Sequence, residues 1–270
     1  MGIGDRPFFT AEWRHLAMLN YEIDPRVLHK FTPPGTELDR WNGRVFVSIV
    51  GFRFLKSRIR GIPVPFHGDF DEVNLRFYVR RKGPEGWRRA VTFIKEIVPR
   101  PAVALTARWL YGENYAVAPM RHAFTFASAG GTGGTGGTGG TGSSGGTGVP
   151  PVSEAPPEPN AVTYEWGNGP QGVRIHIGLD GEFRDSPPVS EAEFISEHYW
   201  GYSRRRGGRT MEYRVEHPRW RVRNATSAEF ECDVAAVYGD AFVEALSAPP
   251  ASAFLADGSA VTVMRGVFLP

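Results

Sequence analysis

Cysteine is almost absent from this chain, which excludes two kinds of structure. Cys232 is the only cysteine among 270 residues, so the chain can form neither an internal disulfide nor a zinc site made of several thiolates. On the strand expected for residues 228–238, Cys232 shares a face with Phe230 and Val234. We interpret it as a buried structural thiol, and cysteine chemistry is not expected.

Long apolar runs are absent as well, and the charges nearly balance. No segment has about 18 uninterrupted apolar residues, and Met1–Pro7 lacks the apolar core of a signal peptide. A formal net charge of +2 is too small to indicate nucleic acid, and the basic runs at Arg80–Lys82 and Arg204–Arg206 accompany no recognised binding module. The sequence predicts a cytoplasmic protein with no membrane or nucleic-acid partner, and it leaves the oligomeric state unknown.

Lysine is scarce, which restricts amine chemistry. Of the 31 lysine and arginine residues only four are lysines, at positions 30, 56, 82 and 95. Lys95 alone lies in a strongly apolar strand, where alternation places it on the face of Phe93 and places Glu96 on the opposite face. One of these two groups should point inward. Lys95 or Glu96 is therefore the candidate general acid or base. The alternative is a structural role, either in an ion pair or as a side chain that extends to solvent near the strand end.

Strand signals dominate the chain. Residues 73–79 alternate with period two, and Asn74, Arg76 and Tyr78 form the polar face. Further runs rich in apolar and β-branched residues occupy positions 10–21, 44–55, 89–98, 172–179, 210–217, 228–238 and 260–268. With glycine and proline between them, they predict a mainly β (α+β) fold in one domain, an antiparallel barrel or strongly curved sheet.

A helix is expected at residues 101–112, because the segment begins with proline and ends with glycine. On this helix Arg108 shares a face with Ala104 and Tyr111.

A second helix should follow the capping box formed by Ser190 and Glu193, and it should carry His198 and Tyr199. Residues 24–29 are expected to form a third, short helix.

Residues 129–160 depart from the rest of the chain in composition. Gly-Gly-Thr repeats give way to a proline-rich stretch, a composition typical of a flexible and then extended linker. Strand-like segments flank it, at 114–126 and 161–166. We interpret it as a disordered insertion that expands a hairpin loop within a single domain of residues 1–270, and a partner-binding arm is the alternative.

The polar face of residues 73–79 is the first candidate binding surface. Asn74 and Arg76 suit a carboxylate or carbonyl ligand, because the arginine fork can bind a carboxylate through two parallel hydrogen bonds. Arg108 could supply a second such contact. The alternatives are a solvated outer face for the strand and a local ion pair for Arg108.

Three histidines, His122, His198 and His217, could form a metal site if their side chains converged in space. No pair has the spacing of a metal motif, so we expect polar histidines in the core or at the rim of the barrel, and no metal.

Several segments together resemble the YqjF-like family, a conserved family of unknown function that is distantly similar in fold to acetoacetate decarboxylase. The resemblance runs from Phe9 to Ala256. It is carried by Phe93–Arg100, Ala107–Tyr115, Pro119–His122, Glu197–Tyr202 and Glu216–Trp220. It implies an acetoacetate-decarboxylase-like β-barrel with two or three short helices, and no particular reaction.

The decarboxylase works through a Schiff-base lysine, in a motif of the form Arg-Glu-x-x-Gly-x-Pro-Lys-Lys. The similar segment here keeps Arg108 and Gly112 but has Tyr115 and Ala116 where the lysine pair would stand. Tyrosine cannot form an imine, so acetoacetate decarboxylase activity is not expected.

These observations predict a protein that binds a small organic acid or carbonyl compound in a barrel cavity, with no cofactor. A lyase or hydrolase of such a compound, using Lys95 or Glu96 without imine chemistry, is one alternative. A scaffold or interaction protein with a filled barrel is another. The candidate ligand-binding residues are Asn74, Arg76, Arg108, Tyr111, Tyr115, His122 and His198.

Overall fold

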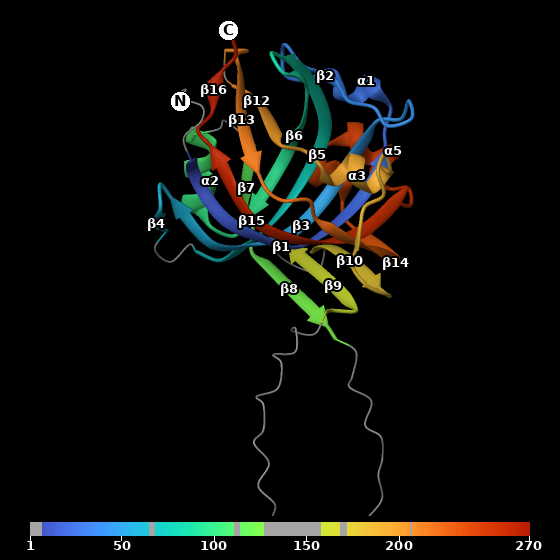
Figure 1. The fold of residues 1–270 in the computed structure, drawn as a ribbon. Helices are drawn as coiled ribbons and strands as arrows, with labels where there is room; N and C mark the ends of the chain where they lie inside the picture. Colours follow the sequence, from blue (N-terminus) through green and yellow to red (C-terminus); the bar gives the residue numbers. More distant parts are fainter. Residues whose placement is uncertain (1–6, 65–67, 111–113, 127–157, 168–171, 206) are drawn as a thin grey trace, which may run out of the picture.

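A computed structural model describes residues 7–64, 68–110, 114–126, 158–167, 172–205 and 207–270. Within these residues seven strands form a closed barrel, because β13 pairs with both β12 and β15 (Figure 1). In barrel order the strands are β13 (Thr210–Glu216), β12 (Trp200–Arg204), β6 (Gly86–Val98), β5 (Phe70–Gly83), β3 (Phe46–Ile59), β1 (Pro7–Glu22) and β15 (Ser252–Met264). The expected barrel is confirmed.

The barrel is mixed, so the prediction of an antiparallel barrel is only partly right. β6 pairs in parallel with β12 on one side. It also pairs in parallel with the short strand β7 (Tyr115–Val117), which follows helix α2 (Pro101–Leu110). Helix α2 carries the chain back to the last residues of β6, Glu96–Val98, and such a crossover is what a parallel neighbour requires.

A second antiparallel layer continues from the barrel. Next to β15 come β14 (Arg221–Glu231), β10 (Val173–Leu179), β9 (Ala161–Trp166) and β8 (Met120–Thr125), and β8 and β9 reach below the barrel in Figure 1. Short strands β2 (Glu37–Leu38), β4 (Ile62–Pro63), β11 (Arg184–Asp185) and β16 (Val267–Phe268) pair with β5, β3, β14 and β13.

Two apolar cores follow from these layers. One fills the space between the outer face of the barrel and the second layer, with Leu19, Leu75 and Ile175 among its buried residues. The other lies inside the barrel and includes Leu16 and Phe254. Each barrel strand therefore buries both faces where the second layer covers it.

The expected insertion lies largely outside the described residues, which leave out 127–157. The strands on either side of it pair directly, with Thr125 opposite Ala161, as a hairpin requires. The expected single strand at 114–126 is wrong, because it is broken at Ala118 and Pro119 into β7 in the barrel and β8 in the second layer.

The three expected helices are present as α1 (Pro25–Leu28), α2, and α3 (Glu191–Ser196). Ser190 caps α3 by accepting a hydrogen bond from the Glu193 amide at 3.2 Å. The helix ends before His198 and Tyr199, so their expected place on it is wrong.

The strand expected at 228–238 is partly wrong. β14 ends at Glu231, and Asp233 then caps helix α4 (Val234–Tyr238) by accepting from the Ala236 amide. The 3₁₀ helix η2 (Asp240–Phe242) and helix α5 (Val243–Leu246) follow.

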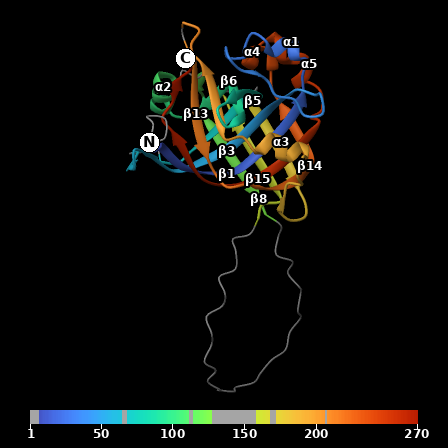
Figure 2. The ribbon, with the colours of Figure 1, turned by 45° about the horizontal axis from the view of Figure 1, so that its top comes forward.

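The helices lie around the barrel. Figure 2 shows α1, α4 and α5 gathered on one side of the molecule and α2 on the other. No helix in the described part of the chain is long and apolar enough to span a membrane.

Candidate functional site

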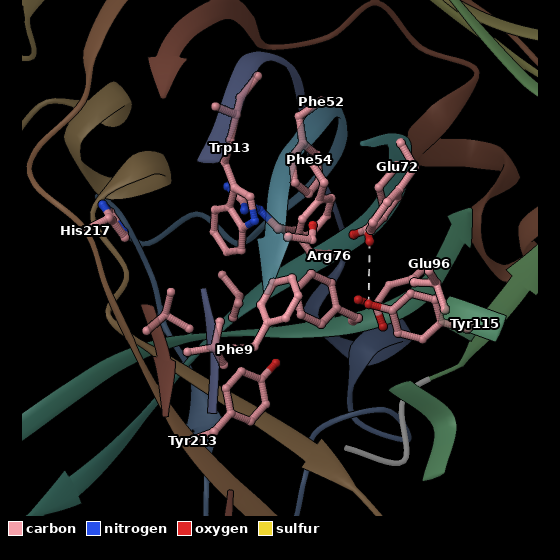
Figure 3. Close-up of a pocket in the computed structure, with 18 of the residues that line it drawn as sticks. Phe9, Trp13, Phe52, Phe54, Glu72, Arg76, Glu96, Tyr115, Tyr213 and His217 are labelled. Carbon is pink, nitrogen blue, oxygen red and sulfur yellow. Dashed lines mark hydrogen bonds between the residues drawn. The ribbon is translucent and has the colours of Figure 1, made fainter. Parts of the chain in front are cut away.

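The barrel interior contains a cavity of about 220 Å³. Its walls come from strands β1, β3, β5, β6, β7, β12, β13 and β15 and from residues around α2 and α3. Figure 3 shows labelled side chains from β1, β3, β5, β6, β7 and β13 converging on it. The cavity therefore draws on elements from almost the whole length of the chain.

β5 supplies the polar wall, and it does so by strand alternation. Glu72, Asn74 and Arg76 face the barrel interior, while Val73 and Leu75 pack in the outer core. The inward orientation expected for Asn74 and Arg76 is what the structure has: Asn74 is 2% exposed and Arg76 is 7% exposed. The solvated outer face considered for this strand is thereby excluded.

Arg76 is the unusual member of this wall. Its Nη2 donates to the Ile195 carbonyl oxygen at 3.3 Å and lies 3.7 Å from Met18 Sδ. Its Nε has no hydrogen-bond partner, and Arg76 forms no ion pair within the described residues. A buried charge with such sparse compensation is costly, so this guanidinium has capacity for a further acceptor.

A β-bulge decides which ionisable residue of β6 enters the cavity. Arg76 pairs with Phe93 while Leu75 pairs with Lys95, so Ile94 is an extra residue in β6. The extra residue reverses the alternation, and Phe93 and Glu96 both line the cavity. The expectation that Lys95 shares the face of Phe93 is wrong. Lys95 instead donates from Nζ to the Val237 carbonyl oxygen at 2.6 Å, outside the cavity.

Glu72, Glu96 and Tyr115 gather on one side of the cavity (Figure 3). The Tyr115 hydroxyl donates to Glu72 Oε2 at 3.5 Å, and Asn74 Nδ2 donates to Glu72 Oε1 at 3.1 Å. Parallel pairing of β7 with β6 sets Tyr115 beside Glu96. This side of the cavity can accept hydrogen bonds and can exchange a proton with a bound molecule.

Aromatic side chains form the rest of the wall. The Trp13 ring packs edge to face against Phe52 and Trp220, with ring centroids 5.6 and 6.1 Å apart. Trp13 Nε1 is buried and has no hydrogen-bond partner. Its indole N–H is therefore a second buried donor without a partner in the wall of the cavity, and the sequence reading assigned Trp13 no binding role.

His198 lines the cavity as a neutral imidazole. Burial, with the nearby charges of Arg89 and Arg76, lowers its pKa well below the usual range. Its ring stacks on Tyr78 at 4.7 Å, and neither ring nitrogen has a hydrogen-bond partner in the described structure. It can therefore offer a ligand one donor and one acceptor.

His217 lies at the edge of the cavity, between the rings of Tyr199 and Trp220. Burial lowers its pKa as well. His122 lies elsewhere, on β8, where its Nδ1 is 2.8 Å from Asp71 Oδ2. The structure therefore separates His122 from His198 and His217, which both line the cavity. No group of three His, Cys, Asp or Glu side chains that could hold a metal occurs among the residues described.

The structure does not place the side chains of two candidates from the sequence. Tyr111 lies outside the described residues, and only the helical backbone of Arg108 is described. The sequence reading missed Glu72, although its place two residues before Asn74 on an alternating strand put it on the same face.

Cys232, the single cysteine, is partly buried, and burial raises the pKa of its thiol to about 12.

The fold is similar to that of acetoacetate decarboxylase-like proteins. The acetoacetate decarboxylase of Legionella pneumophila superposes with a TM-score of 0.60 at 13% identity, over 100% of this chain and 90% of that one. An acetoacetate decarboxylase-like enzyme from Sphingomonas wittichii RW1 gives 0.61 at 12% identity, over 98% and 94%. The enduracididine biosynthesis enzyme MppR, complexed with pyruvate, gives 0.60 at 13% identity, over 98% and 91%.

The chain belongs to the DUF2071 family of uncharacterized conserved proteins, which it matches over residues 10–260. It is 30% identical over 110 residues to the uncharacterized protein YqjF of Bacillus subtilis (strain 168), a match over 40% of this chain and 44% of that protein. The match thus spans less than half of this relative. The expected family is confirmed, and so is the acetoacetate-decarboxylase-like barrel, although its strands are mixed and not antiparallel throughout.

Proposed function

We propose that the protein is a cytoplasmic single-domain protein that binds a small organic acid or carbonyl compound in its barrel cavity. The observation that carries the proposal is Arg76, a buried guanidinium that lines the cavity with its Nε unpartnered and no ion pair among the described residues. A ligand carboxylate or carbonyl oxygen would complete its hydrogen bonding and, if charged, offset its charge.

The other donors support the same proposal. Trp13 Nε1 and the ring nitrogens of His198 are also buried without partners and line the same cavity. Buried polar atoms are rarely left unsatisfied in native proteins, and a ligand rich in oxygen would satisfy several of these at once. The structural neighbour MppR is described in complex with pyruvate, a ligand of this chemical class.

A lyase or hydrolase of such a ligand is the second candidate. The bulge in β6 places Glu96 in the cavity, where it could serve as a general acid or base. Lys95 is not proposed for this role, because its amine is engaged by Val237 outside the cavity. A scaffold with a filled barrel is the weaker candidate, because a cavity of about 220 Å³ remains inside.

The test compares two buried arginines by substitution with methionine, which keeps length and removes charge. Arg76→Met removes the cavity guanidinium. Arg223→Met is the control, because Arg223 is equally buried but donates to the carbonyl oxygens of Pro159 and Asp180 away from the cavity. Native mass spectrometry of each protein, purified from its own host, identifies a retained molecule, and calorimetric titration with that molecule measures affinity.

We expect wild type and Arg223→Met to retain an acid or carbonyl compound. Arg76→Met should bind it about 10- to 100-fold more weakly, since a hydrogen bond to a charged group contributes about 1.5–3 kcal/mol. Unchanged affinity in Arg76→Met would contradict the proposal. So would failure of the wild type to retain such a molecule, together with no rise in its melting temperature across a panel of short carboxylic acids, aldehydes and ketones.

A further inference from the structure

The cavity has two chemically different sides, which restricts the ligand more than Arg76 alone does. Glu72, Glu96 and Tyr115 lie together on one side, and Trp13, Tyr213 and His217 lie on the other (Figure 3). A molecule that fills the cavity therefore meets two carboxyl groups and a hydroxyl at one end and aromatic rings at the other, with Arg76 between them (Figure 3).

The aromatic side is a packed cluster with few alternative arrangements. Phe54 stacks on Phe70 at 4.6 Å, and Trp13 meets Phe52 and Phe54 edge to face at 5.6 and 5.8 Å. Each of these rings is held by neighbours from β1, β3 or β5. Rings fixed in this way do not collapse to fill unoccupied space, because close-packed interiors relax only partially.

The size of the cavity favours ligands larger than the shortest acids. Its volume of about 220 Å³ is many times the about 10–15 Å³ that one water molecule needs. An acid of three or four carbons held at Arg76 would leave the aromatic side to water, which finds few partners there. An apolar body against those rings would release that water and gain dispersion contacts.

We infer that the ligand is an organic acid that carries a phenyl-sized apolar body, with its acid head at Arg76 and its body against Trp13 and Phe54. This inference rests on the proposed function and names its substrate class. Trp13 Nε1, which is buried without a partner, donates a hydrogen bond to a polar substituent on that body. Trp13 is thus a specificity-determining residue.

Calorimetric titration with three matched compounds tests the class of ligand. Pyruvate supplies the head alone, phenylpyruvate supplies head and body, and phenylacetone supplies the body with a ketone but no acid. We expect phenylpyruvate to bind at least about tenfold more tightly than either of the others. Pyruvate lacks the apolar group and phenylacetone lacks the charged hydrogen bond, and each of these contributes a factor of about ten or more to affinity.

The outcomes separate the inference from the proposed function. If pyruvate binds as tightly as phenylpyruvate, the apolar body is wrong while the proposed function stands. If phenylacetone binds as tightly as phenylpyruvate, the acid head is wrong. If none of the three compounds binds, and no member of the panel of short acids and carbonyl compounds raises the melting temperature, both the proposed function and this inference are wrong.

A second titration isolates the indole N–H. The three isomeric hydroxyphenylpyruvates are compared with phenylpyruvate in the wild type and in Trp13→Phe, which keeps an aromatic ring and removes the donor. Trp87→Phe is the control, because Trp87 is 52% exposed and outside the cavity. At least one isomer should bind about fivefold or more tightly than phenylpyruvate, and only Trp13→Phe should abolish this gain. No gain in any isomer, or a gain that survives in Trp13→Phe, would overturn the role of Trp13.

Discussion

Asp71 and Glu72 are consecutive on β5 and serve different layers of the molecule. The Asp71 carboxylate lies 2.8 Å from His122 Nδ1 on β8, and the Glu72 carboxylate accepts from the Tyr115 hydroxyl inside the barrel. Strand alternation alone produces this division. The second layer is thereby attached to the barrel directly behind the polar wall of the cavity.

The contact between Asp71 and His122 should contribute to stability without contributing to binding. His122→Phe keeps an aromatic ring beside Phe124 and leaves the buried Asp71 carboxylate without its closest partner. We expect a loss of about 1–3 kcal/mol in the free energy of unfolding, measured by urea denaturation. Arg121→Met, which removes an exposed ion pair on the same strand, should change it by less than about 1 kcal/mol. Equal effects of the two variants would contradict this assignment.

His15 should make stability depend on pH. Burial, followed by the charges of Arg53 and Arg14, lowers its pKa from 6.5 to about 4. Between these values the unfolded chain holds a proton that the folded protein does not, so stability falls as the pH is lowered through this window and levels off below it. His15→Asn suits the positive φ of 54° and should flatten the fall in urea titrations. His29→Asn, an exposed control, should not; identical profiles for all three proteins would exclude His15 as the cause.

Incubation with acetoacetate or acetylacetone followed by borohydride should leave no adduct. Tyr115 occupies a likely lysine position of the related motif, and the Lys95 amine donates to the Val237 carbonyl oxygen instead of facing the cavity. An imine needs a free amine beside the bound carbonyl. Mass spectrometry of the intact protein provides the measurement. A mass increase that maps to the peptide of Lys95 and disappears in Lys95→Arg would show that this lysine does react.

Excision of the insertion should leave the fold intact. Thr125 and Ala161 pair directly across its ends, and long surface loops cost little in closure entropy. Replacing residues 130–157 by a short glycine-serine loop keeps Glu158, which lies 3.9 Å from the Arg223 guanidinium. The far-ultraviolet spectrum and the cooperative melting should then match those of the full chain. A loss of cooperative melting would mean that the segment is part of the folded structure.

The sequence predicts the polar wall of the cavity because that wall follows a regular alternation. Asn74 and Arg76 stand at every second position of β5, and their burial follows once the strand is known to be part of a barrel. The strand runs predicted a barrel or a strongly curved sheet, and the family resemblance favoured the barrel. The parallel pairing of β6 with β12 and β7 could not be predicted, because it depends on how distant segments of the chain return to β6.

The errors have local physical causes. Residues 234–238 are apolar and partly β-branched, which favours a strand, but the Asp233 cap and Gly239 at the other end favour the helix that forms. No sequence signal marks the bulge at Ile94. Because β6 is buried on both faces, its odd-numbered and even-numbered positions are both mainly apolar, and the sequence does not show where the inward face changes. The unpartnered state of Arg76 Nε is also invisible in sequence, since it depends on what every other strand brings to the cavity.

The bulge in β6 makes register, rather than residue identity, the determinant of the chemistry available in the barrel. Lys95 and Glu96 are neighbours, and the strand can turn only one of them inward. With the extra residue at Ile94 the cavity receives a carboxylate. A sequence that straightened β6 at the same length would present an amine there instead, so a change in backbone geometry alone would exchange an acid for a potential nucleophile.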